Sequence, residues 1–348
     1  MKLIVVNPKI KQKNSMQLDR IRENIATDLE ATEQLINELV SSDLGVPSQQ
    51  VPAIAKEIGK HVIKSGGKRL RPVLSLLAAK ACGYENEESR IKLAAVIELI
   101  HIATLLHDDV VDDSTQRRGR PSANTIWNNS ASILVGDYFI SRAFDLVASM
   151  DNINIVKVLA STTNAMATGE VQQLMQRHNP NITEEDYRHV IYSKTASLFR
   201  AATMLGAMSS NASEAEKIAL ASFGEHLGNA FQMVDDLLDY SDDSKTIGKN
   251  IGDDLAEGKT TLPLIYALNS NNISKEEKET IKKAVIHGKV EDFEIVQSAI
   301  IKSKAIEYTI NAAHKEADLA VEALLDIKDS IYKERLLELA KFAVVRAK

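Results

Sequence analysis

Two acidic motifs of the same form are the residues of this chain best suited to chemistry. The first reads DDVVD at residues 108–112, and the second reads DDLLD at residues 235–239. In each motif the first and last aspartates are four positions apart, so on a helix they share one face at a separation of about 6 Å. No lysine or arginine lies one turn away in either motif, so ion pairs within the helix do not account for the carboxylates.

Paired carboxylates are hard oxygen ligands of the kind that Mg²⁺ prefers. Two facing helices that each carry such a motif can hold Mg²⁺ ions together with the diphosphate group of a substrate. The alternative is a pair of exposed helix ends with solvated carboxylates. That alternative is reasonable for one motif alone, but the recurrence of the motif favours the metal site.

A polar stripe leads into the first motif. His101, Thr104, Asp108 and Asp112 follow helical spacing and share one face, whereas the leucines and isoleucines between them face the rest of the bundle. Charged groups on an otherwise apolar helix must meet water, a ligand or a metal, because an unpaired buried charge is very unfavourable. The stripe therefore predicts that this helix lines a site.

Basic residues accompany the acidic motifs at several places. GGKRLRP at residues 66–72 opens a predicted helix, and RRGR at residues 117–120 follows the first motif. Guanidinium groups bind phosphate oxygens as a fork, and backbone N–H groups at a helix N-terminus add to the attraction. Lys249 and Lys259 lie in glycine-rich turns after the second motif, and Lys194 lies within a predicted helix. A single basic residue is more often an ordinary surface residue, but the set indicates an anion site.

Composition limits the remaining possibilities. The 348 residues are 44% hydrophobic with only 7 prolines and 15 glycines, which favours helix nearly throughout. A net charge of −6 argues against a nucleic-acid-binding protein, and the single Cys82 excludes an internal disulfide. No apolar run approaches the roughly 20 residues needed to span a bilayer. We therefore expect a cytoplasmic protein without a transmembrane segment.

The elements that must position these residues are helices. We expect a flexible leader at residues 1–15 and a single all-α domain at residues 16–348, built as a helical bundle around a central cavity. The predicted helices cover residues 16–40, 52–65, 70–83, 87–113, 122–149, 151–177, 183–208, 213–240 and 260–269, followed by two or three more. This arrangement lets the two acidic helices face each other.

The motifs and their order resemble the trans-polyprenyl diphosphate synthases, head-to-tail prenyltransferases of the all-α isoprenoid-synthase fold. The resemblance rests on residues 66–72, 105–119, 194–195, 231–240 and 248–263, and the spacing agrees from about residue 50 to residue 270. Within the family, ASILVGD at residues 131–137 and VIYSKTA at residues 190–196 look most like the bacterial octaprenyl branch.

The resemblance implies a role for each site residue. The metal ligands would be Asp108 and Asp112 for two Mg²⁺ ions and Asp235 for a third, supported by Asp109, Asp236 and Asp239. Isopentenyl diphosphate would be bound by Lys68, Arg71, His101 and Arg118. The allylic diphosphate would be bound by Arg117, Lys194, Lys249 and Lys259, aided by Thr195 and Gln232. Catalysis would depend most on Asp108, Asp112, Lys194, Thr195, Gln232 and Asp235.

Product length in this family depends on an apolar tunnel below the first motif. Ala103 and Thr104 lie one to one and a half turns deeper than Asp108, about 6–8 Å along the helix, and both are small. An open tunnel implies a long product, most simply an octaprenyl chain for a quinone such as ubiquinone, with Phe139 or Phe144 as a candidate floor. The family's usual homodimer and a transient membrane contact for product release are further expectations.

Several other functions are compatible with parts of the pattern. The product could range from geranylgeranyl to nonaprenyl, or the chain could be a subunit of a heteromeric prenyl synthase, although its motifs are intact. A terpene cyclase shares the metal site but lacks a basic site for isopentenyl diphosphate, so Lys68 and Arg71 argue against it. His107 next to Asp108 suggests a histidine–aspartate phosphohydrolase, but only His101 lies near enough to be a further histidine ligand.

Overall fold

The computed structural model describes residues 8–41, 51–83, 86–240, 252–288 and 290–345, and these form a bundle of helices. The N-terminal half contains α1 (Pro8–Glu23), α2 (Ala26–Ser41), α3 (Ala53–Lys64), α4 (Leu70–Ala81), α5 (Glu87–Val111), α6 (Ala123–Trp127), α7 (Asn129–Ala148) and α8 (Ile153–Gln176). The C-terminal half contains α9 (Glu184–Ile191), the π-helical η1 (Tyr192–Ala196), α10 (Ser197–Met208), α11 (Glu214–Leu238), α13 (Asp253–Ala256), α14 (Leu262–Asn269), α15 (Lys275–His287), the 3₁₀ turn η2 (Val290–Asp292), α16 (Phe293–Ser303), α17 (Ala305–Ala323) and α18 (Ile331–Val345). The strands β1 (Gln116–Arg117) and β2 (Arg120–Pro121) pair antiparallel in a short hairpin.

Side-chain caps define where several helices begin. Thr183, Ser213 and Ser274 each form a capping box at the start of α9, α11 and α15, and in each box an acidic side chain three residues later bonds back to the cap. Such a box satisfies two N–H groups that the first turn leaves without helical partners. The starts of α9 and α11 agree within one residue with the predicted ones.

Three predicted boundaries differ from the structure. Helix α1 begins at Pro8, inside the stretch expected to be a leader, and residues 24–25 separate it from α2. The helix predicted at residues 122–149 is divided into α6 and α7 at Asn128, which has a φ of 74° and accepts a hydrogen bond from the N–H of Ala131. Periodicity alone did not reveal this break, because apolar spacing is the same on both sides of a single left-handed residue.

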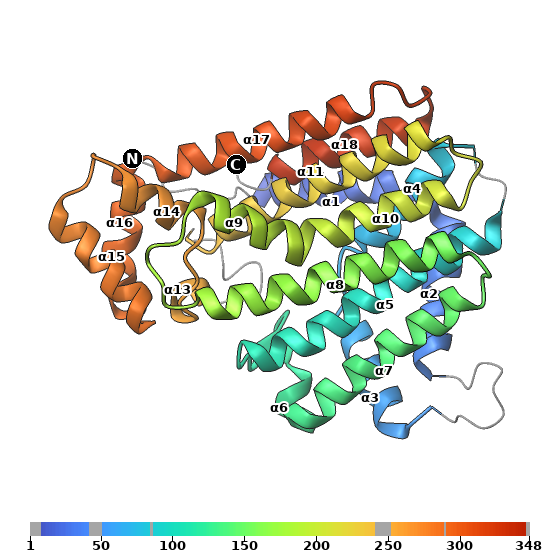
Figure 1. Ribbon diagram of the computed structural model, residues 1–348, viewed down its shortest axis with the longest axis horizontal. Helices are drawn as coiled ribbons and strands as arrows, with labels where there is room; N and C mark the ends of the chain where they lie inside the picture. The colour runs from blue at the N-terminus through green and yellow to red at the C-terminus, as the bar shows by residue number, and fades with distance from the viewer. Residues whose placement is uncertain (1–7, 42–50, 84–85, 241–251, 289, 346–348) are drawn as a thin grey trace.

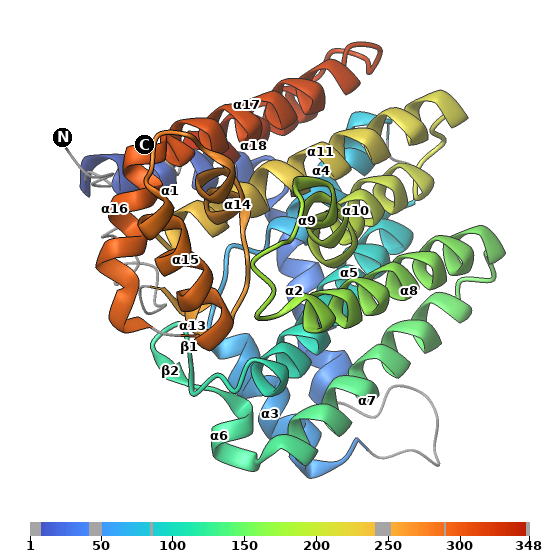
Figure 2. The same ribbon diagram turned by 60° about the vertical axis from the view of Figure 1, so that its left-hand side comes forward.

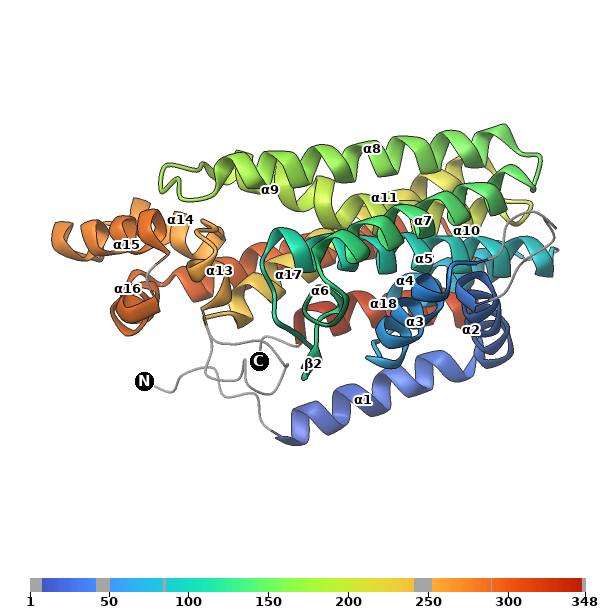
Figure 3. The ribbon, with the colours of Figure 1, turned by 90° about the horizontal axis from the view of Figure 1, so that it is seen from below.

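The long helices lie side by side along the longest axis of the molecule (Figure 1), with α11 packed between α10 and α17 and with α5 against α7. Their apolar faces form the main core, whose largest fully buried side chains include Phe139, Phe199 and Phe223. A second, smaller core lies among α13 to α16 around Leu264 and Ile300. Helix α1 lies at the edge of the bundle (Figure 3).

The elements that carry the motifs meet at one end of this bundle. The C-terminal ends of α5, α8 and α11 point toward α13 (Figure 1), and the β1–β2 hairpin lies at the same end (Figure 2). Among the described helices, none is both long and apolar enough to cross a membrane. Cys82, the only cysteine of the sequence, caps α4 and is half-buried, and burial raises the pKa of its thiol to about 11.

Candidate active site

The first acidic motif occupies the last turn of α5. Asp108 and Asp112 are half-buried, whereas Asp109 is only 2% exposed. The Asp109 carboxylate accepts hydrogen bonds from Nε (2.8 Å) and Nη2 (2.7 Å) of Arg117, and its backbone carbonyl accepts one from Asn124 (3.0 Å). Asp109 therefore ties the β1–β2 hairpin to α5, and Arg117, which we expected at the allylic diphosphate, is engaged with it in this structure.

The carboxylates of Asp108 and Asp112 have cationic partners from other parts of the chain. Nζ of Lys194 lies 3.6 Å from Asp108, Nζ of Lys259 lies 3.3 Å from Asp112, and Arg177 also pairs with Asp112. The absence of a basic residue one turn away was thus a poor guide to pairing, because tertiary packing supplies the cations. Burial alone would raise the pKa of Asp112, but Lys259, Lys194 and Arg177 hold it below its usual value.

The second motif lies at the end of α11 and is connected to η1 and α9 by a chain of hydrogen bonds. The Thr195 hydroxyl donates to Oε1 of Gln232 (2.9 Å), and Nε2 of Gln232 donates to Asp236 (2.7 Å). The Tyr187 hydroxyl donates to the other oxygen of Asp236 (2.6 Å). Burial, reinforced by the nearby Asp254, raises the pKa of Asp236 to about 7. Asp236 therefore connects α11 to α9 through Tyr187 and to η1 through Gln232 and Thr195.

The other two aspartates of this motif differ in their surroundings. Asp239 is buried and accepts a hydrogen bond from the backbone N–H of Asp254 (3.1 Å), which joins the end of α11 to α13. Asp235 is half-buried, and its charge partly offsets the burial that lowers the pKa of Arg71. Of the three, Asp235 is accordingly the one whose surroundings suit a metal ligand.

A basic pocket lies beside the N-terminus of α4, where Arg22, Gly67 and Arg69 line a cavity. The guanidinium of Arg118 fits against Gly67, where an added Cβ would lie 2.5 Å from Nη1. Gly67 has a φ of 149°, a backbone conformation that favours glycine. Arg69 forms a buried ion pair with Glu98 (2.6 Å). Burial lowers the pKa of Arg71 to about 10. The structure thus gathers guanidinium groups where the sequence predicted an isopentenyl diphosphate site.

His101 and Lys68, the other two residues expected at isopentenyl diphosphate, differ in their surroundings. Burial, followed by the charges of Arg71 and Arg118, holds the pKa of His101 well below its usual value, so the imidazole is neutral near pH 7. A neutral imidazole can still donate one hydrogen bond to a phosphate oxygen. Lys68 is exposed, with its ammonium 5.2 Å from the centroid of the Phe342 ring.

The π-helical segment η1 presents Lys194 to the first motif. Nζ of Lys194 donates to Glu170 (2.9 Å) and to Gln173 (3.0 Å), both on α8. The approach of α8 depends on Gly169, where an added Cβ would lie 2.7 Å from Cβ of Ser193 and 2.9 Å from N of Lys194. Single π-turns of this kind are frequent at functional sites. Neither the π-turn nor Glu170 was predicted, since both depend on the contact between α8 and η1.

The structure describes one of the two lysines after the second motif. Burial alone would lower the pKa of Lys259, but Asp254, Asp112 and Glu257 raise it, so its ammonium stays charged. Lys259 is therefore brought to the first motif, as a ligand for a shared anion requires. Lys249 lies outside the described residues.

The donor atoms fit Mg²⁺ held jointly with a diphosphate. Within the described ranges, no three histidine, cysteine or acidic side chains are grouped as a ready-made ion site. Asp108, Asp112 and Asp235 supply hard carboxylate oxygens, and Mg²⁺ commonly takes only one or two carboxylates, with phosphate oxygens and water completing its shell. The clustered cations Lys194 and Lys259 then suit the phosphate oxygens.

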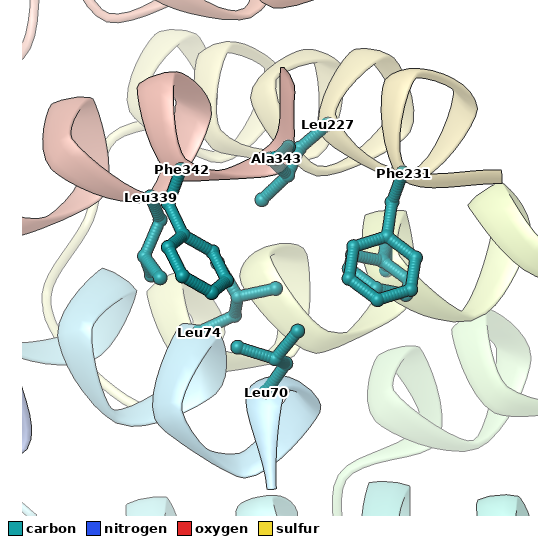
Figure 4. A pocket seen from close by; sticks show the side chains of 8 residues that line it. Leu70, Leu74, Leu227, Phe231, Leu339, Phe342 and Ala343 are labelled. Carbon is teal, nitrogen blue, oxygen red and sulfur yellow. The ribbon is translucent and has the colours of Figure 1, made fainter. Parts of the chain in front are cut away.

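An apolar pocket adjoins the basic pocket (Figure 4). Its lining residues come from α4, α10, α11 and α18 and are Leu70, Leu74, Phe199, Leu227, Phe231, Leu339, Phe342 and Ala343. The Arg71 guanidinium lies 4.7 Å from the centroid of the ring of Phe199, one of the lining residues. This pocket is distinct from the predicted product tunnel, because neither Ala103 nor Thr104 lines it.

The residues predicted to define the tunnel lie on α5 and α7. Ala103 is fully buried, and the Thr104 hydroxyl donates to the backbone carbonyl of His101 (2.8 Å). Phe139 is fully buried, with its ring against Gly59 of α3, and Phe144 is half-buried. Their role in chain length stays a prediction.

Comparison with known proteins gives the family. Residues 52–301 match the family model for polyprenyl synthetase. The chain belongs to the polyprenyl synthetase family. It is 44% identical over 322 residues to an all-trans-nonaprenyl-diphosphate synthase (geranyl-diphosphate specific) of Rhodobacter capsulatus. The alignment covers 92% of this chain and 96% of the relative. It is 42% identical over 332 residues to an octaprenyl diphosphate synthase of Escherichia coli, covering 95% and 99%.

Solved structures agree with the assignment to the polyprenyl synthetase family. A polyprenyl synthase from Caulobacter crescentus, complexed with calcium and isoprenyl diphosphate, superposes with a TM-score of 0.88 at 40% identity, covering 95% of this chain and 98% of that one. The predicted all-α isoprenoid-synthase fold and the predicted prenyltransferase class are confirmed.

His107 fits the polyprenyl synthetase assignment and not a histidine–aspartate phosphohydrolase. Its Nε2 lies 3.2 Å from the carbonyl oxygen of Ile133 and 3.3 Å from the carboxylate of Asp137, both on α7. The ring also packs against Gly136. His107 therefore faces α7 and is held by contacts with that helix.

Proposed function

We propose that this polyprenyl synthetase is a long-chain all-trans polyprenyl diphosphate synthase whose product is octaprenyl diphosphate. It would add isopentenyl diphosphate head to tail to an allylic primer such as farnesyl diphosphate. The observation that carries the proposal is the pair of adjacent anion sites: the basic pocket around Arg71 and Arg118, and the aspartates and lysines around Asp112. An enzyme that joins two diphosphate substrates needs both.

The two sites would hold the substrates in distinct ways. Arg71, Arg118 and neutral His101 would bind the diphosphate of isopentenyl diphosphate through hydrogen bonds, with Glu98 keeping Arg69 in place. Lys194 and Lys259 would bind the allylic diphosphate beside Asp108 and Asp112. When bound, Mg²⁺ would stabilise the negative charge of the departing pyrophosphate, which is the main electrostatic contribution to ionisation of the allylic substrate.

The remaining residues would maintain the geometry in which the carbocation is captured. The chain from Thr195 through Gln232 and Asp236 to Tyr187 fixes η1 relative to α11. Water must be excluded from the site during the reaction, because it would otherwise trap the carbocation. Addition of the isopentenyl double bond and loss of a proton complete one round of elongation.

Long products are supported by the small side chains at Ala103 and Thr104 and by the kinds of relative. The similar proteins include octaprenyl and nonaprenyl synthases. Our proposal of eight isoprene units for this chain is therefore a choice among long products. We propose that the octaprenyl chain becomes the side chain of a quinone such as ubiquinone. We also propose that the enzyme is cytoplasmic and contacts the membrane transiently when it releases its product.

A homodimer is the assembly we propose. Helices α7 and α8 expose large apolar side chains, namely Ile133, Leu134, Ile153, Val171, Leu174 and Met175. Exposed apolar surface of this kind marks interaction sites on soluble proteins. A second copy that covers α7 and α8 would bury these side chains.

Product analysis tests the proposal directly. The purified chain is incubated with Mg²⁺, farnesyl diphosphate and isopentenyl diphosphate, and the products are measured by mass spectrometry. A dominant forty-carbon product is expected. A longer product would correct the chain length, a fifteen- or twenty-carbon product would contradict the open tunnel, and no elongation would favour a subunit of a heteromeric synthase.

A further inference from the structure

Arg177 reaches the first acidic motif from the C-terminal cap of α8. Its Nη2 pairs with Oδ1 of Asp112, and its Nη1 donates to the backbone carbonyl of Val111 (3.2 Å). The side chain is 17% exposed. Its buried Nε–H has no hydrogen-bond partner among the described residues. The guanidinium therefore has spare donor capacity at the site, and no sequence motif included it.

The turn after Arg177 is fixed to the segment that carries Lys259. His178 has a φ of 62°, its N–H donates to the carbonyl of Gly258 (2.8 Å), and its Nδ1 lies 3.1 Å from the carbonyl oxygen of Val285. The Thr260 hydroxyl donates to the carbonyl of Asn179 (2.8 Å). Arg177 and Lys259 thus approach one carboxylate from two segments that are bonded to each other, so both cations are positioned in advance.

The charges around Asp112 indicate what happens when Mg²⁺ and diphosphate arrive. A carboxylate that coordinates Mg²⁺ cannot keep its full pairing with Lys259 and Arg177. A buried guanidinium that loses its carboxylate is unfavourable unless another anion replaces it. Diphosphate oxygens beside Asp112 provide that anion, and they match the planar fork of an arginine.

We propose that Arg177 is an additional ligand of the allylic diphosphate, next to Lys194 and Lys259. It pairs with Asp112 in this structure, and with Mg²⁺ and diphosphate bound it donates its hydrogen bonds to the diphosphate. The inference deepens the proposed function and rests on it. The competing role is a purely structural ion pair, in which Arg177 only opposes metal binding at Asp112.

The two roles predict different changes in pyrophosphate affinity. We would titrate inorganic pyrophosphate into the full chain at saturating Mg²⁺ by isothermal calorimetry. If Arg177 binds the diphosphate, Arg177→Gln weakens pyrophosphate binding by about tenfold or more, which is typical for a hydrogen bond to a charged group. Arg177→Lys keeps the charge but loses the fork, so its loss should be smaller. If Arg177 is only structural, its removal leaves binding unchanged or makes it tighter.

Arg200→Gln is the matched control, since it removes another arginine from an ion pair, that with Glu225 at 3.5 Å, on α10 and α11. It should bind pyrophosphate like the wild type. Thermal unfolding without metal reports whether each variant folds, and if Arg177→Gln does not, Arg177→Lys carries the test alone. Wild-type or tighter affinity in every folded Arg177 variant overturns the inference. Failure of the wild type itself to bind pyrophosphate with Mg²⁺ contradicts the proposed function instead.

Discussion

The three aspartates of the second motif illustrate how identical residues acquire different tasks. Asp236 is buried among Tyr187 and Gln232, Asp239 binds the backbone of α13, and Asp235 is half-buried beside the basic pocket. The spacing DDLLD predicted that the first and last members share a face, but it could not distinguish a ligand from a positioning group. Burial and hydrogen-bond partners make that distinction.

Tyr187 is a positioning residue that the sequence analysis missed. Tyr187→Phe removes the 2.6 Å hydrogen bond to Asp236 and leaves a buried acceptor oxygen with one partner fewer. We expect about a tenfold loss in kcat/KM and a higher Mg²⁺ requirement, because a hydrogen bond to a buried carboxyl group contributes about 1.5–3 kcal/mol. Steady-state kinetics against Mg²⁺ concentration provides the measurement. Tyr308→Phe is the control, since Tyr308 donates an equally short bond to Glu184 away from the motifs, and comparable losses in both variants would refute the positioning role.

Ala103 tests the product tunnel. Replacing it with phenylalanine places a ring one turn below the first motif, so the product should become shorter than that of the wild type. Because Ala103 is fully buried, the ring overpacks the core by about 1–3 kcal/mol, and Ala103→Val is a milder companion. Mass spectrometry of the products measures their chain length. An unchanged chain length in a folded, active Ala103→Phe variant would exclude Ala103 from the tunnel wall.

At the scale of elements, the contact between α8 and η1 sets the position of Lys194. Gly169→Ala adds a methyl group that meets Ser193 and the backbone of Lys194, so α8 must move away. We expect destabilisation of about 1–3 kcal/mol by urea unfolding, together with a fall in kcat larger than the folded fraction explains. Thr168→Ala, on the exposed side of the same turn, should change neither quantity. Full activity of the Gly169→Ala variant would show that Lys194 tolerates the displacement.

Helices α11 and α17 are joined by an ion pair that responds to pH. Nδ1 of His226 lies 2.8 Å from Glu316, and this hydrogen bond raises the pKa of His226 above its usual value. The folded protein therefore holds the proton more tightly than the unfolded chain, so the stabilisation is complete below about pH 6.5 and is lost as the pH rises through the folded pKa. Urea unfolding at pH 6 and pH 8.5 should show a difference of about 1 kcal/mol or less from this pair. A His226→Gln variant that retained the same pH dependence would rule the pair out as its source.

The helices were largely predictable, whereas the partners of the motif residues were not. Apolar periodicity and capping residues located α4, α5, α8 and α11 closely, because both signals are local. Arg177, Tyr187 and Glu170 became visible only in the structure, since they reach the motifs from α8 and α9. The π-turn at Lys194 also escaped prediction, because it depends on the approach of Gly169 and leaves no pattern in the apolar spacing.

For the whole molecule, α7 and α8 form the surface that a second copy is expected to cover. Leu134 is 67% exposed and Leu174 is 54% exposed. Replacing both with glutamate should convert the dimer to a monomer, because two copies of each charge would have to be buried. Size-exclusion chromatography with light scattering provides the mass. Leu325→Glu, at a residue 72% exposed between α17 and α18, should leave the dimer intact. A monomeric wild type would contradict the proposed assembly.

The half-buried Cys82 makes the chain convenient for site-specific labelling. A thiol with a pKa of about 11 is almost entirely protonated at neutral pH, and the thiolate is the form that reacts with maleimides and methanethiosulfonates. A cysteine introduced at an exposed position such as Leu325 would therefore react far faster than Cys82. Spin labels or fluorophores can then be placed without first removing the natural thiol, and distances between labels can follow the helix ends as substrate binds.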